Sequence, residues 1–111
     1  MNLKFNFECT NNKISIQTSW HTEFEYTATE ECVYYLYVAI DSSAYISSQI
    51  RLNDKNIGGF NTVFSNTAYG TSRSTSIILP LQANDKLELL LATPDIVKTE
   101  NVFIIKGKLQ S

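Results

Sequence analysis

The chain contains few of the residues from which most catalytic and metal sites are built. Its 111 residues include two cysteines, one histidine and one tryptophan. Cys9 and Cys32 form neither a CxxC pair nor a zinc spacing, and the sequence leaves open whether they bond to each other. His21 would have to be the base in any Ser-His-acid or Cys-His mechanism, yet no G-x-S-x-G or similar nucleophile motif is present. We therefore expect a protein without enzymatic activity, metal or cofactor.

Long apolar runs and clusters of positive charge are also absent. No stretch approaches the roughly 18 apolar residues of a membrane helix, and the start, MNLKFNFECTNNK, lacks the basic-then-apolar profile of a secretory signal. The nine lysines and arginines are scattered and the net charge is −2, so we expect no nucleic-acid partner. The sequence predicts no membrane insertion and no signal peptide. A location on a virion or an extracellular surface would then need another exit route, such as release within a virus particle.

The composition is that of a folded domain with a rather neutral surface. Apolar residues make up 43% of the chain and charged residues 18%, which excludes intrinsic disorder. A chain of this length can bury a core without metals or a disulfide framework. We expect one domain over residues 1–111.

The stretch that organises the chain is residues 25–40, EYTATEECVYYLYVAI. From residue 32 onward the side chains on both alternating faces are apolar or aromatic. A strand with one face in water alternates apolar and polar residues, so here both faces need a cover. We expect another subunit to supply one cover, because large rings with a polar tip suit a subunit contact. The expected interface residues are Tyr34, Tyr35, Tyr37 and Leu90.

Short alternating segments separated by polar turns make up the rest of the chain. Strands are expected over residues 3–8, 14–16, 22–26, 32–40, 45–52, 60–64, 75–81, 87–92 and 102–109. The pattern predicts a turn at residues 10–13, and in the last strand it places Phe103 and Ile105 inward and Lys106 and Lys108 outward. Pro80 indicates a bulge or a sheet edge. No helical period persists, so the fold class is all-β: an antiparallel β-sandwich, jelly-roll-like, with eight to nine strands.

Three segments together resemble a family of trimeric jelly-roll heads. They are YTA at 26–28 with Glu30-Glu31 before the aromatic strand, ILPLQANDKL at 78–87, and FIIKG at 103–107. Phage tail and fibre proteins and gut-bacterial surface proteins carry such heads, whose architecture is related to tumour-necrosis-factor and complement globular-head domains. Cys32 stands where that pattern usually has glycine, and Asn84 stands where glycine precedes Asp85. The resemblance covers about residues 25–108 and implies an exterior receptor-binding or decoration module built as a homotrimer.

Aromatic and planar polar side chains in apparent loops or strand ends provide the chemistry for sugar recognition. A sugar needs an aromatic plate against its apolar face and hydrogen-bonding groups beside it. Tyr69, on a Gly-flanked loop, is the best exposed candidate. The predicted ligand-binding residues are Trp20, Tyr69, Arg73, Asn66 and Arg51.

Two sets of acidic residues could support functions other than sugar recognition. Glu23, Glu25, Glu30 and Glu31 could pair as glycosidase carboxylates, and Asp41, Asp54, Asp85 and Asp95 could hold calcium. Solvated edge charges and turn-favouring aspartates explain both sets more simply.

The sequence supports two functions from different classes. The first is a non-enzymatic, trimeric head of a phage particle or bacterial surface that recognises a cell-surface glycan through three weak sites. The alternative is a monomeric carbohydrate-binding module or lectin-like domain of a bacterial protein. A small hydrolase on the same fold is a third, weaker candidate.

Overall fold

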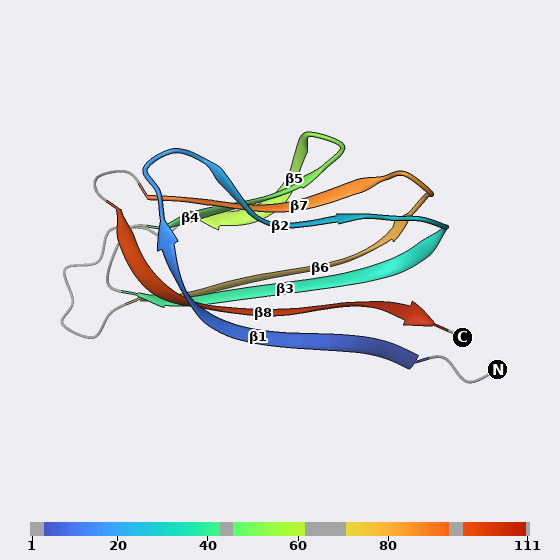
Figure 1. Cartoon of the computed structure of the whole chain (residues 1–111), viewed down its shortest axis with the longest axis horizontal. Coiled ribbons are helices and arrows are strands. Elements are labelled where there is room, and N and C mark those ends of the chain that lie inside the picture. The colour runs from blue at the N-terminus through green and yellow to red at the C-terminus, as the bar shows by residue number, and fades with distance from the viewer. Residues whose placement is uncertain (1–3, 43–45, 62–70, 94–96, 111) are drawn as a thin grey trace.

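Two antiparallel sheets face each other in the computed structural model, which describes residues 4–42, 46–61, 71–93 and 97–110 (Figure 1). Sheet A has the strand order β1-β8-β3-β6 and sheet B the order β2-β7-β4-β5. The strands are β1 (Lys4–Ile16), β2 (His21–Thr27), β3 (Cys32–Ser42), β4 (Ser47–Leu52), β5 (Lys55–Asn61), β6 (Thr71–Leu81), β7 (Lys86–Ala92) and β8 (Lys98–Gln110). This arrangement confirms the predicted all-β sandwich of jelly-roll type. The described residues include no helix long and apolar enough to cross a membrane.

The core lies between the central strands of the two sheets. On β3 the even-numbered side chains point inward, and Leu36 and Val38 are fully buried. On β7, Leu87, Leu89 and Leu91 are fully buried as well. Each such side chain stabilises the fold by about 1.5–3 kcal/mol relative to an exposed position. Packing between β3 and β7 therefore holds the two sheets together.

The first strand is longer than the sequence pattern indicates. Residues 10–13, predicted as a turn, continue β1, which pairs with β8 without a register shift from Lys4↔Gln110 to Ile16↔Lys98. Asn11 and Asn12, which are both exposed, favour a turn locally. Long-range pairing with β8 outweighs that preference, because strand propensity depends strongly on context.

The inward face of β8 is the opposite of the predicted one. Val102 and Ile104 are 0% and 6% exposed, whereas Phe103 and Ile105 lie on the outer face of sheet A. The register with β3 decides this, because Val38 pairs with Ile104 and paired residues share a face. The prediction that Phe103 and Ile105 point inward and that Lys106 and Lys108 point outward was therefore wrong.

The described residues leave the outer face of sheet A uncovered. Neighbouring strands place apolar side chains on it in register; they are Phe7, Cys9, Val33, Tyr35, Tyr37, Ile78, Pro80, Phe103, Ile105 and Leu109. Phe7 is 50% exposed and Ile78 60%. Pro80 lies on β6, an edge strand, as predicted.

The four predicted interface residues divide between the core and this outer face. Tyr34 and Leu90 are each 5% exposed and offer almost no surface to a second copy. Tyr35 and Tyr37 are partly exposed on the outer face of sheet A. The homotrimer stays a prediction.

Candidate functional site

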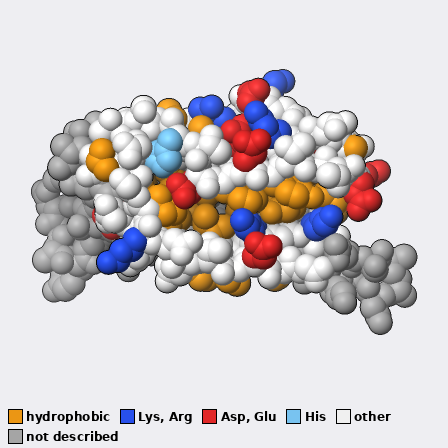
Figure 2. All heavy atoms as spheres, in the orientation of Figure 1, with side chains coloured by type: hydrophobic (Ala, Val, Ile, Leu, Met, Phe, Trp, Pro, Cys, Tyr) orange, Lys and Arg blue, Asp and Glu red, His pale blue; other side chains and the backbone are white. Residues whose placement is uncertain are grey.

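A groove opens between the two sheets on the side where β1 and β2 lie. Figure 2 shows it as a band of apolar side chains flanked by positive and negative charges. Its volume is about 330 Å³, and it is lined by Asn6, Glu8, Phe24, Tyr26, Tyr34, Lys106, Gly107 and Lys108. Strands β1, β8, β3 and β2 supply these residues.

The groove forms because the inner side of sheet A becomes polar at β1 and β8. Glu8 pairs in register with Lys106, and Asn6 with Lys108. These positions continue the inward-facing rows of β3, where Leu36 lies opposite Lys106. Since β2 is the edge strand of sheet B, the polar side chains lie beside an open edge instead of under a closed core.

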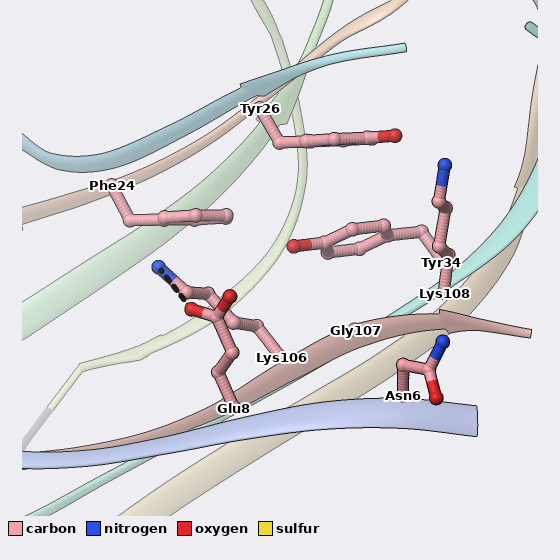
Figure 3. Close-up of a pocket in the computed structure, with 8 residues that line it drawn as sticks. All are labelled: Asn6, Glu8, Phe24, Tyr26, Tyr34, Lys106, Gly107 and Lys108. Atoms are coloured by element: carbon pink, nitrogen blue, oxygen red, sulfur yellow. Dashed lines mark ion pairs between the residues drawn. The ribbon is translucent and has the colours of Figure 1, made fainter.

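Three aromatic rings form the wall of the groove (Figure 3). The ring centroids of Tyr26 and Tyr34 are 4.4 Å apart with an interplanar angle of 20°. Those of Phe24 and Tyr34 are 6.4 Å apart at 19°. Tyr34 is almost fully buried, and burial, followed by the nearby Tyr26, raises its pKa. Burial also raises the pKa of Tyr26. Both phenols are therefore neutral in the physiological range and can donate a hydrogen bond.

Lys106 links the aromatic wall to the acidic side of the groove. Its Nζ lies 4.2 Å from the centroid of the Phe24 ring, within the range of a cation–π contact. The same Nζ lies 3.9 Å from Oε2 of Glu8, whose side chain is 76% exposed. The ammonium of Lys106 on β8 thus contacts side chains of both β1 and β2 at the groove edge, while the Glu8 carboxylate stays accessible to solvent.

The groove combines the groups that sugar recognition uses. Partly buried aromatic rings can pack against the C–H face of a pyranose, while a carboxylate, an amide and ammonium groups can bond its hydroxyls. The volume lies near the lower end of the usual range for ligand pockets, about 300–1,000 Å³.

Of the five predicted ligand-binding residues, the structure describes the side chains of Trp20 and Arg51, and neither of them lines the groove. Trp20 is 39% exposed between β1 and β2, whereas Arg51 lies on β4, where its Nε donates a 2.9 Å hydrogen bond to Oε1 of Gln49. The backbone of Arg73 belongs to β6, but its side chain is outside the described part of the chain. Asn66 and Tyr69 also lie outside the described residues.

His21 has an acidic neighbour. Its Nε2 lies 3.5 Å from Oε2 of Glu23, and burial raises the pKa of that carboxyl while the imidazole opposes the rise. Glu23 and Glu25 flank Phe24 on β2, the edge strand of sheet B, and Glu30 and Glu31 are exposed between β2 and β3. The Glu side chain that lines the groove is Glu8, which belongs to neither predicted pair.

Two of the four aspartates that could have held calcium, Asp54 and Asp85, serve turns. Asp85 bonds Asn53 and the backbone of Gln82, and Asp54 forms an ion pair with Lys86. Asp95 lies outside the described residues, and the side chain of Asp41 does as well. Within the described ranges, no three His, Cys, Asp or Glu side chains gather in a way that would hold a metal ion. Cys9 and Cys32 are free thiols.

Sequence reasoning missed the groove because it assigned Lys106 and Lys108 to the solvent face. One signal was available: Asn6 and Glu8 alternate with Phe5 and Phe7. If the phenylalanine face of β1 is the outer one, the polar residues must face the interior of the sandwich.

Comparisons with known proteins establish the fold. Neither a protein-family model nor a curated protein matches the sequence. Among solved structures, the dimeric latent PorU of Porphyromonas gingivalis superposes with a TM-score of 0.53 and 13% identity over 94% of this chain, which spans 13% of the PorU chain. A family 35 carbohydrate-binding module from an environmental isolate superposes with a TM-score of 0.51 and 13% identity, covering 100% of this chain and 93% of the module. At such identities the similarity shows a shared β-sandwich.

Proposed function

We propose that the protein is a non-catalytic carbohydrate-binding domain and that its ligand occupies the groove between β1, β8 and β2. The observation that carries the proposal is the groove itself, in which the Tyr26 and Phe24 rings lie beside the exposed Glu8 carboxylate. The family 35 carbohydrate-binding module, similar over the whole chain, supports the same class of function. This is the alternative function that the sequence suggested. It agrees with an extracellular location.

In this proposal the aromatic wall and the polar edge have separate tasks. A pyranose ring packs its apolar face against Tyr26 and Phe24, which are already held in place by Tyr34. Glu8 accepts hydrogen bonds from sugar hydroxyls, and Asn6 and Lys108 position the ring along the groove. Because the rings are fixed before binding, little side-chain entropy is lost. The volume is suited to one or two sugar units.

A glycan array followed by titration calorimetry on the best ligand tests the proposal. Glu8→Gln keeps the size of the side chain but removes its charge, and we expect about a tenfold loss of affinity, as for a charged hydrogen bond. Glu31→Gln is the matched control, because Glu31 is exposed in the loop before β3, and it should bind like the parent. Lys106→Met should also weaken binding, because Glu8 and the Phe24 ring lose the ammonium that holds them.

Trp20→Ala distinguishes a ligand site in the groove from an alternative ligand site in the connection between β1 and β2, where Trp20 lies. If this substitution abolishes binding while Glu8→Gln leaves it unchanged, the ligand site is at the β1–β2 connection and the groove proposal is wrong. Circular dichroism of each variant shows whether the fold is intact.

The trimeric phage head remains a second candidate. The uncovered face that carries Tyr35 and Tyr37 favours self-association, but the solved structures reported above give a virion role no support. The mass of the chain in solution tests the trimer.

A further inference from the structure

Strand β2 departs from regular alternation next to the groove. Tyr26 and Phe24 lie on its inner side. Strict alternation would place Thr22 inward next and Glu23 outward. The register with β7 shifts between Thr22 and Phe24, however, so that Glu23 is an extra residue at this point. Thr22 is accordingly exposed, whereas Glu23 and His21 are partly buried. A bulge of this kind re-aims side chains, and here it turns Glu23 and His21 toward the side that carries the aromatic wall.

The pairing of His21 shows to which side these two residues point. His21 pairs with Leu91, which is fully buried in the core, and paired residues share a face. Nε2 of His21 lies 3.5 Å from Oε2 of Glu23, so the carboxylate is on the same side. In Figure 2 the histidine lies above one end of the apolar band. The inner side of β2 thus carries the aromatic wall and then, further along the strand, a carboxylate and an imidazole.

The contact between Glu23 and His21 leaves hydrogen-bonding capacity unused. Their 3.5 Å distance is longer than a normal hydrogen bond of about 2.7–3.2 Å, and neither ring nitrogen of His21 has a hydrogen-bond partner within the described ranges. Burial raises the pKa of Glu23 more than His21 lowers it, because the carboxylate has lost part of its hydration. Its side chain is still 22% exposed, and that of His21 is 23% exposed. A partly dehydrated carboxylate that solvent can reach is suited to accept hydrogen bonds from hydroxyl groups.

The rows of the two sheets stay in step along the groove. On sheet A, the row of Tyr34 lies against Tyr26, and the next row, which holds Lys106, lies against Phe24. The row after that contains no charged residue of the described ranges. The Glu23 carboxylate, one position beyond Phe24, therefore lies beside a row that offers it no ammonium. Its acceptor sites remain available to a ligand.

We propose that Glu23 and His21 form a further subsite of the groove and that the ligand is a linear oligosaccharide lying along β2. This inference rests on the proposed sugar-binding function and adds the class of sugar. Between Tyr26 and His21 the strand advances by the length that separates their partners Leu87 and Leu91, about 14 Å of strand, which is more than one pyranose ring covers. One sugar unit packs against the aromatic wall, and a following unit donates hydroxyl hydrogen bonds to Glu23.

The position of the two carboxylates favours a chain over a single terminal sugar. Glu8 belongs to β1 and Glu23 to β2, the edge strands of the two sheets. A single sugar held by Glu8 and the aromatic wall leaves Glu23 unused. A chain that continues along the groove contacts both, so each carboxylate acts on a different sugar unit.

Calorimetric titration with oligosaccharides of increasing length tests the subsite. The probes are cello-, xylo-, manno- and chito-oligosaccharides of two to five units. For the parent, we expect affinity to rise with length until the chain spans the distance from Tyr26 to His21. Glu23→Gln should bind the longest probe about tenfold more weakly, as for a lost hydrogen bond to a charged group, and the disaccharide like the parent. Glu25→Gln is the matched control, because Glu25 is exposed on the other face of the same strand, and it should bind every probe like the parent.

The histidine supplies a second measurement that needs no substitution. His21 is the one histidine of the chain, so its ring protons are readily assigned in an NMR spectrum. Their signals should shift when the pentasaccharide is added and stay in place with the disaccharide. Signals that stay in place with both probes would overturn the subsite.

The outcomes separate the subsite from the groove itself. If Glu8→Gln weakens binding at every length while Glu23→Gln binds all lengths like Glu25→Gln, the groove binds sugar and the subsite proposal is wrong. If no probe binds the parent, or if Glu8→Gln changes nothing, the proposed function fails and the subsite fails with it. Thermal melts verify that the variants are folded.

Discussion

The side-chain amide of Asn53 joins two turns that are 32 residues apart. Its Nδ2 donates a 2.9 Å hydrogen bond to Oδ1 of Asp85, and its Oδ1 accepts one of 2.9 Å from the backbone N–H of Lys86. Asp85 also accepts a 2.8 Å bond from the backbone N–H of Gln82. The β4–β5 turn and the β6–β7 turn are thereby held together at one end of the sandwich.

Removing the Asn53 side chain should destabilise the domain. We expect Asn53→Ala to lower the melting temperature by roughly 5 °C, because two hydrogen bonds are lost. Asn53 has φ of 50°, a left-handed conformation that alanine adopts with strain. Asn53→Gly loses the same bonds without that strain, so it should melt between the parent and Asn53→Ala. Equal melting of parent and Asn53→Gly would show that the two hydrogen bonds contribute nothing.

Asp85 should make stability depend on pH in the acid range. Hydrogen bonds from Asn53 and then from Gln82 hold the pKa of Asp85 below its usual value of 3.8. Because the folded pKa is the lower one, the contribution is present above the unfolded pKa and is lost as pH falls through the folded value. Urea midpoints should therefore be higher for the parent than for Asp85→Asn at neutral pH, and the gap should narrow below about pH 4. A gap that widens toward acid would contradict this assignment.

Gly107 should tolerate no side chain. A Cβ at this position would collide with the carbonyl oxygen of Asn6 on the neighbouring strand. Gly107→Ala should therefore push β1 away from β8 and cost about 1–3 kcal/mol of unfolding free energy. Gly58→Ala is the control, because its Cβ would meet the Ile50 side chain at ordinary contact distances, 3.9 Å to Cδ1 and 4.0 Å to Cβ. Chemical denaturation of both variants tests the difference, and a Gly107→Ala protein as stable as Gly58→Ala would refute it.

Tyr34 should ionise at a higher pH than a tyrosine with the ordinary pKa near 10. Burial raises its pKa, so ultraviolet titration of the folded protein should show a delayed phenolate signal that Tyr34→Phe removes. A raised folded pKa stabilises the fold below the unfolded pKa, near 10, and this stabilisation is lost as pH rises above it. Alkaline unfolding should consequently begin at higher pH in Tyr34→Phe. If all tyrosines instead titrate together near pH 10, the Tyr34 ring is not buried in the core and the prediction is wrong.

Much of the fold follows from local sequence patterns. The aromatic strand at residues 32–40 is an inner strand of sheet A, and Pro80 lies on an edge strand. These features depend on backbone preferences of single residues or on unbroken alternation, and both are visible without knowing any partner strand.

The missing information concerns long-range register. In residues 102–105, VFII, both alternating faces are equally apolar, so alternation could not choose the inward one. Pairing with β3 made the choice and turned Lys106 toward the interior. The groove therefore could not be predicted, because its residues come from four strands whose alignment only the folded chain defines.

Strand β8 lies between β1 and β3 but follows both in the chain. During synthesis β1 therefore waits without its hydrogen-bonding neighbour until nearly the entire domain has left the ribosome. Its Phe7 side is open to solvent throughout that interval, when contacts with other nascent chains lead to aggregation. Sheet A therefore closes only when β8 pairs with β1 and β3, and contacts so far apart in the sequence give slow folding.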